Sequence, residues 1–173
     1  GSVSIGNGVT AGTFYTRGTS ASIPTVTAFD TGGPTRYSFT VTSTGSVDVG
    51  RLNFAYPDNN GLTINDGATV VDIDNVAFTD VGGATGTYLR ILDTGAGPVY
   101  AFSGCSFDAN CQYNVSSVAG YTSNIVMTSW SGARGGETFE NDRGAGVDAN
   151  GNIDWVVVNS PTVLIWDNDN GAD

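Results

Sequence analysis

The sequence contains no lysine and no histidine in 173 residues. Its six basic residues are all arginines: Arg17, Arg36, Arg51, Arg90, Arg134 and Arg143. Without lysine the chain cannot form Schiff bases or lysine–asparagine cross-links, and without histidine it lacks the residue most used for proton transfer near neutral pH. These absences count against many enzyme classes. We therefore expect a non-enzymatic protein with no cofactor other than structural calcium.

Positive charge is scarce as well. Six basic residues face 17 acidic ones, so the net charge is −11 and the isoelectric point is about 4.1. Nucleic-acid binding requires a basic surface, so nucleic acid is excluded as a partner. No apolar run has the length of a signal peptide or a membrane span, so we expect no membrane insertion and a mature or excised chain. The acidic, Gly/Thr/Asn-rich composition is typical of extracellular or cell-surface proteins.

Cysteine is also rare. The two cysteines, Cys105 and Cys111, flank a turn at residues 108–110. In an oxidising compartment this spacing predicts a disulfide that closes one corner of the fold. A buried pair of free thiols is the alternative. Two cysteines without a further ligand make a poor zinc site.

What the sequence does have is a repeat, seen most clearly in residues 61–78. Three short pieces with alternating apolar residues are separated there by tight breaks, and similar units precede and follow them. One anchor position is a closing aromatic residue: Phe29, Phe54, Phe78, Phe107, Trp130 and Trp155. A second anchor opens the unit: Phe39-x-Val41, Leu62-x-Ile64, Leu89-x-Ile91, Tyr113-x-Val115, Phe139 and Val163-x-Ile165. A third lies between them: Val47-x-Val49, Val71-x-Ile73, Tyr100-x-Phe102 and Ser123-x-Ile125.

Three alternations per period predict three short strands per period, each with one buried face. We therefore predict one all-β domain over residues 1–173, a single-stranded right-handed parallel β-helix of about six coils of about 25 residues. Residues 1–20 are expected to form an N-terminal arm or a partial coil, and residues 167–173 an acidic tail. An antiparallel sandwich is the alternative, although it gives no reason for the same three-part pattern to recur in order.

Acidic residues suggest calcium in three places. Asp48 and Asp72 occupy the same position one coil apart, with Asp74 two residues on, and stacked carboxylates need a cation between them. Two segments with alternating oxygen-bearing side chains resemble calcium loops without the EF-hand spacing: Asp148-x-Asn150-Gly151-Asn152-x-Asp154 and Asp167-x-Asp169-x-Gly171-x-Asp173. Solvated aspartates and Asx-rich turns are the alternative interpretations.

Two further sites are predicted. Asn114-Val115-Ser116 is an N-glycosylation sequon. The most apolar segments lie near the C-terminus, with no amphipathic helix to cap either end of a solenoid. We therefore expect an end-to-end assembly interface that includes Val156, Val158, Val163, Ile165 and Trp166, with copies of the chain as partners.

The pattern Leu62-x-Ile64-x-x-Gly67-Ala68-x-Val70-x-x-Ile73-x-Asn75-Val76-x-Phe78 resembles the coils of the pectin-lyase-like β-helix superfamily. Residues 130–138 with Ile153-x-Trp155 also look like repeat regions of large bacterial surface proteins. The superfamily's catalytic set, a basic residue beside a calcium-binding acidic cluster, has no residue-by-residue match here, so no catalytic residue is predicted.

The expected function is structural, either a subunit that stacks head to tail into a surface filament or a stalk segment of an adhesin. The alternative is a protein that binds or cleaves carbohydrate. Cleavage requires two carboxylates that face a groove, and Glu137 and Glu140 are the only glutamates.

Overall fold

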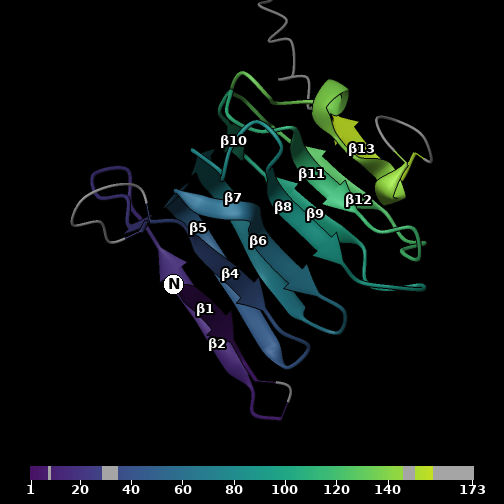
Figure 1. The fold of residues 1–173 in the computed structure, drawn as a ribbon, viewed down its shortest axis with the longest axis horizontal. Coiled ribbons are helices and arrows are strands. Elements are labelled where there is room, and N and C mark those ends of the chain that lie inside the picture. The colour runs from purple at the N-terminus through teal and green to yellow at the C-terminus, as the bar shows by residue number, and fades with distance from the viewer. Residues whose placement is uncertain (8, 29–34, 146–150, 158–173) are drawn as a thin grey trace, which may run out of the picture.

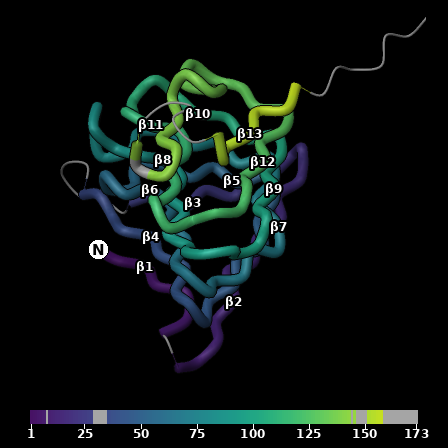
Figure 2. Tube along the Cα trace, turned by 90° about the vertical axis from the view of Figure 1, so that its right-hand side faces the viewer, coloured from purple at the N-terminus to yellow at the C-terminus, as the bar shows by residue number. Residues whose placement is uncertain are grey.

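The computed structural model describes residues 1–7, 9–28, 35–145 and 151–157 of the chain. It is an all-β parallel solenoid of about four turns, so the predicted fold class is confirmed, with fewer coils than the six expected. The strands stack along one axis, from the N-terminal coil at one end to β13 at the other (Figures 1 and 2). The predicted tail at residues 167–173 lies outside the described residues.

Two long parallel sheets form the walls. Within the described residues the first has five strands in spatial order: β1 (Ser2–Ile5), β4 (Tyr37–Val41), β6 (Pro57–Asn65), β8 (Thr87–Leu92) and β11 (Tyr113–Ser117). The second has as its main path β2 (Gly12–Arg17), β5 (Gly45–Ala55), β7 (Thr69–Thr79), β9 (Tyr100–Ser103), β12 (Ile125–Thr128) and β13 (Ile153–Val156).

A third, shorter wall continues from the second. Beyond the middle of β5 and β7, the strand β3 (Thr25–Val26) pairs with β5, and β10 (Ser106–Phe107) pairs with β7. A full coil therefore has three strand segments, as predicted. The N-terminal residues contribute β1 and β2 to this scheme, so they form a coil rather than a loose arm.

The chain turns from the second wall to the third at a corner with left-handed backbone. Register places four positive-φ residues at this corner in successive coils: Arg51, Asn75, Gly104 and Ser129, with φ between 53° and 64°. Of these, asparagine and glycine are the residues that adopt this conformation most readily. One such residue breaks the extended chain and redirects it without ending the inter-strand ladder.

The core is a set of side-chain ladders that run along the axis. Phe54 pairs with Phe78 and Phe78 with Phe107, with ring centroids 5.8 Å and 5.4 Å apart. Val41, Ile64 and Ile91 form an aliphatic ladder on the first sheet and are each 0% exposed. Each inward side chain is covered by its equivalents in the coils on both sides, so burial depends on stacking.

The predicted repeats are correct in the middle and displaced toward the C-terminus. Trp155 pairs with Met127 in the second wall and therefore does not close a unit after Phe107. Ser131 bridges Ser106, which places Trp130 level with Cys105, two residues from the predicted position.

Other displacements are of the same kind. Val115 pairs with Leu89, and Ile125 pairs with Tyr100, each two residues from the predicted alignment. A register shift after Val47 leaves Val71 61% exposed, so Val71 is not an inward anchor. Phe29, Val163 and Ile165 lie outside the described residues.

The loop-rich segment near the C-terminus contains two short 3-10 helices, η1 (Glu137–Phe139) and η2 (Asp142–Gly144). They pack against β11, and Ser116 bridges Asn141. Irregular backbone thus takes the place of a regular strand at this end of the first sheet.

Candidate functional site

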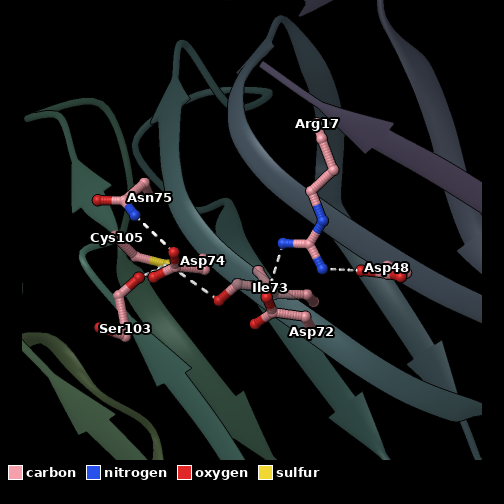
Figure 3. A network of polar contacts seen from close by, with 8 residues as sticks. All are labelled: Arg17, Asp48, Asp72, Ile73, Asp74, Asn75, Ser103 and Cys105. Atoms are coloured by element: carbon pink, nitrogen blue, oxygen red, sulfur yellow. Dashed lines mark hydrogen bonds and ion pairs between the residues drawn. The ribbon is translucent and has the colours of Figure 1, made fainter. Parts of the chain in front are cut away.

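The stacked carboxylates predicted from the sequence are present. Asp48 on β5 pairs directly with Asp72 on β7. Between them lies the guanidinium of Arg17, which forms one ion pair with Asp48 and a second, at 2.7 Å, with Asp72 (Figure 3). A single arginine of the N-terminal coil therefore contacts the next two coils.

Gly50 makes room for this contact. It pairs with Arg17 across the sheet, and a Cβ on Gly50 would lie 2.6 Å from the Arg17 guanidinium. The bare backbone lets the arginine lie flat across β5 and reach β7. The hydrogen bond to Asp72 raises the pKa of Arg17, so the guanidinium keeps its positive charge at any physiological pH.

The positive charge expected between the Asp48 and Asp72 carboxylates is thus supplied by Arg17. Asp74, the third predicted ligand, accepts a hydrogen bond from Asn75 at 2.5 Å. No group of three or more acidic, cysteine or histidine side chains suited to a metal occurs in the part of the chain that the structure describes. Four other predicted ligands lie outside that part: Asp148, Asn150, Asp167 and Asp169.

The predicted Cys105–Cys111 disulfide is absent. Both residues are free thiols, buried at 0% and 1% exposure. Cys105 points inward, with its Sγ 3.9 Å from the Ile73 carbonyl and 3.7 Å from the Ser103 carbonyl (Figure 3). Burial raises the pKa of Cys105 to about 12 and that of Cys111 to about 11, so both thiols are unreactive in the folded chain.

The sequon at Asn114 is not available as a glycosylation site in the folded chain. Asn114 is 0% exposed, and its side-chain amide donates to the carbonyls of Arg134 and Gly136 at 2.7 and 2.8 Å. These two hydrogen bonds connect β11 to the loop before η1. Its role is therefore to satisfy buried backbone groups.

A groove of about 540 Å³ lies over β8 and β11. Arg90, Arg143 and Tyr113 line it together with asparagine, serine, threonine and small apolar residues, and none of its lining residues is acidic. Arg90 donates to the side chain of Asn60, and Arg143 donates to the Tyr121 carbonyl at 2.8 Å. The groove therefore has two guanidinium groups held by hydrogen bonds in a protein of net charge −11.

The corner after the first wall contains a pair of carboxyl groups. Asp93 is 3% exposed, accepts a hydrogen bond from the Tyr100 hydroxyl at 2.9 Å, and lies within hydrogen-bonding reach of Asp66. Burial raises the pKa of Asp93, and the hydrogen bond from Asp93 lowers that of Asp66, so a proton bound to this pair is held on Asp93. Glycosidase carboxylates stand roughly 5–9.5 Å apart. The Asp66 and Asp93 carboxyl groups are in hydrogen-bonding contact, so a structural role in joining two coils fits them better.

The two glutamates considered from the sequence for carbohydrate cleavage, Glu137 and Glu140, differ in their surroundings. Glu140 is 0% exposed and accepts a hydrogen bond from the Trp155 indole, whereas Glu137 is exposed. The two side chains therefore lie in different environments, which does not match the catalytic arrangement considered from the sequence.

The N-terminal coil has open edges. Among the described residues, no strand pairs with the outer edge of β1 or of β2 (Figure 1). Val3, which faces the interior, is 37% exposed, and Phe14 is only partly buried against Phe39 at a centroid distance of 5.0 Å. This end thus combines unpaired backbone groups with incompletely covered core side chains.

At the opposite end, β13 is the last strand of the second sheet. Val156, the one predicted interface residue that the structure describes, is 44% exposed on β13, and its neighbour Val157 is 67% exposed. Val158, Val163, Ile165 and Trp166 lie outside the described residues. Trp155 is covered from within by Trp130, with ring centroids 5.1 Å apart.

Sequence reasoning missed Arg17 because residues 1–20, expected to form an arm or a partial coil, were not aligned with the later coils. A signal was available: Tyr15-x-Arg17 aligns with Asp48-x-Gly50, which places a long cation over a glycine and beside an aspartate. It also missed the Asp66–Asp93 pair. The two residues lie in turns between strands, where the sequence has no repeating pattern that would align them.

No protein-family model, curated protein or solved structure matches this chain. Among residues 1–7, 9–28, 35–145 and 151–157, no helix combines the length and apolar character needed to cross a bilayer.

Proposed function

We propose that this chain is a non-enzymatic structural module of an extracellular or cell-surface assembly, a β-solenoid that stacks end to end on copies of itself. The observation that carries the proposal is the open N-terminal coil. No strand of the described residues pairs with the outer edge of β1 or β2, and Val3 and Phe14 are only partly covered. A second copy stacked on this end would supply the missing coil and bury them.

The opposite end is a suitable partner. β2 and β13 are the two outermost strands of the same parallel sheet, so β13 of one copy has the direction needed to continue the sheet at β2 of the next. Such a contact joins two different surfaces, and a head-to-tail contact that does not close on itself produces a filament. Main-chain pairing across the joint would add to the apolar burial.

A proline at the N-terminal edge tests the proposal. Gly12 and Gly18 donate their N–H groups toward β5. Successive N–H groups of a strand point to opposite sides, so the Thr13 N–H points away from β5. Thr13→Pro removes that outward donor while sparing the β5 ladder, and Thr13→Val is the matched control that keeps it. We expect wild type and Thr13→Val to form concentration-dependent oligomers by light scattering and negative-stain imaging, with Thr13→Pro shifted to monomer. A wild-type chain that stays monomeric at all concentrations contradicts the proposal.

The groove over β8 and β11 supports a second candidate, the binding of an acidic polysaccharide. Its two arginines and Tyr113, with no acidic lining residue, suit a chain of uronate residues. Polygalacturonate is the probe, and Arg90→Gln should weaken its binding about tenfold or more. Arg51→Gln, at an exposed corner outside the groove, should not. A monomeric chain that binds this probe would favour the second candidate over the first.

A further inference from the structure

Two acidic side chains are completely buried near the C-terminal end of the described chain. Glu140 directly follows η1, and Asp142 is the first residue of η2. Both side chains are 0% exposed. The Asp142 carboxyl lies within hydrogen-bonding reach of Glu140. Two carboxylates in contact in a buried site repel each other unless a positive charge joins them.

One oxygen of this pair has no partner. Asp142 Oδ2 accepts a hydrogen bond from the Gly151 N–H at 3.0 Å, but Asp142 Oδ1 is buried and makes no hydrogen bond. On the other residue, Glu140 Oε2 accepts from the Trp155 indole N–H. A buried oxygen without a partner is uncommon in folded proteins and commonly marks an ion or water.

The two carboxyl groups offer only oxygen atoms to a cation. The backbone N–H groups of Gly151, Asn152 and Ile153 lie against the Asp142 carboxyl group. Oxygen ligands of this kind, with no sulfur or imidazole, suit calcium.

We propose that Glu140 and Asp142 bind a divalent cation, with calcium the best fit. The cation takes the unpartnered oxygen of Asp142 and the carboxylate of Glu140, and it neutralises both buried charges. The calcium-loop pattern that ends at Asp154 supports this assignment, because its described residues Gly151 and Asn152 lie against Asp142. The proposed site is not the calcium-loop pattern itself, because its two carboxylates, Glu140 and Asp142, come before the pattern in the sequence. It does not depend on the proposed assembly.

The experiment uses the full chain after EDTA treatment, titrated with calcium chloride by calorimetry and followed by tryptophan fluorescence and thermal unfolding. We expect one calcium ion per chain, a higher unfolding temperature, and altered fluorescence because Trp155 donates to Glu140. Asp142→Asn should weaken binding by about tenfold or more.

Two further variants make the test decisive. Glu140→Gln keeps an acceptor for Trp155 and should also weaken binding, which covers the case in which Asp142→Asn does not fold. Asp154→Asn is the matched control, since Asp154 belongs to the calcium-loop pattern but lies on β13 bonded to Asn124 at 2.8 Å. It should bind calcium like the wild type. The absence of a calcium effect on heat, fluorescence and unfolding temperature would overturn the proposal, and so would normal binding by both Asp142→Asn and Glu140→Gln.

Discussion

The N-terminal coil and the middle coils share the same strand pairing but differ in burial. In β4 the inward residues Tyr37, Phe39 and Val41 are at most 7% exposed, whereas Val3 at the equivalent level of β1 is 37% exposed. The alternation of inward and outward residues is similar in β1 and β4. The difference is that no coil of the described residues covers β1 on its outer side. Burial in this solenoid is therefore supplied by the neighbouring coils, and the inward residues of an end coil are less completely covered than those of a middle coil.

The two ends also differ from each other. The N-terminal end is regular and open, whereas the C-terminal end of the described chain is irregular, with two 3-10 helices and buried polar groups at Glu140, Asp142 and Asn152. Regular edges can pair with another strand, so the pairing edge at the C-terminal end of the described chain is β13 and not the segment with the two 3-10 helices. The contrast favours the N-terminal coil as the surface that another copy completes.

The largest expected effect separates a middle ladder from an end ladder. Phe78→Ala removes a ring that is 0% exposed and stacked between Phe54 and Phe107, so it should lower the free energy of unfolding by about 3–5 kcal/mol. Phe14→Ala in the end coil should cost only about 1–2 kcal/mol, because its ring is partly in solvent already.

Urea unfolding followed by circular dichroism measures both losses. Val71→Ala, at a 61% exposed position of the same strand as Phe78, is the control and should change little. Equal losses for Phe78→Ala and Phe14→Ala would contradict the view that neighbouring coils supply the burial.

A smaller effect is expected at the carboxyl pair of the middle coils. Because the folded-state pKa of Asp93 is raised, its contribution to stability is present below its ordinary pKa of 3.8 and is lost as the pH rises through the raised value. Asp93→Asn cannot ionise but can still accept from Tyr100. The unfolding temperature of Asp93→Asn relative to wild type should therefore increase from pH 3.5 to pH 7, by a few degrees.

Thermal unfolding across this pH range provides the measurement. Asp58→Asn is a suitable control, because either side chain can accept the hydrogen bond from the Asn60 N–H. If the difference between Asp93→Asn and wild type does not change with pH, Asp93 does not hold the proton of this pair.

The smallest effect concerns Arg17, which joins the end coil to the middle. Its side chain is 37% exposed, so each ion pair should contribute roughly 0.2–1 kcal/mol and weaken with salt. Arg17→Gln should lower the unfolding free energy by that amount at low ionic strength, and the loss should shrink in 1 M sodium chloride.

Gly50→Ala tests the same contact from the other side, because its methyl group would displace the Arg17 guanidinium. Arg51→Gln, an exposed arginine one residue away, is the control for loss of positive charge. A double-mutant cycle with Asp72→Asn that shows no coupling would mean that Arg17 does not tie the coils together.

The sequence by itself determined the class of fold. Alternation of apolar residues with a period of two, repeated three times per unit, leaves few options other than stacked parallel strands. It also placed Asp48 beside Asp72 and aligned Phe54, Phe78 and Phe107, because in these coils the spacing between anchors is regular.

The tertiary structure alone decided the register toward the C-terminus, the state of the cysteines and the identity of the cation at the acidic pair. A slip of two residues keeps every apolar side chain inward, so alternation cannot distinguish Ile125 opposite Tyr100 from Ile125 opposite Phe102. Likewise, Arg17 reaches Asp72 across 55 positions of sequence because two coils bring them together over the bare backbone of Gly50. Contacts between coils depend on how the turns stack, and that is a property of the whole solenoid and not of any one repeat.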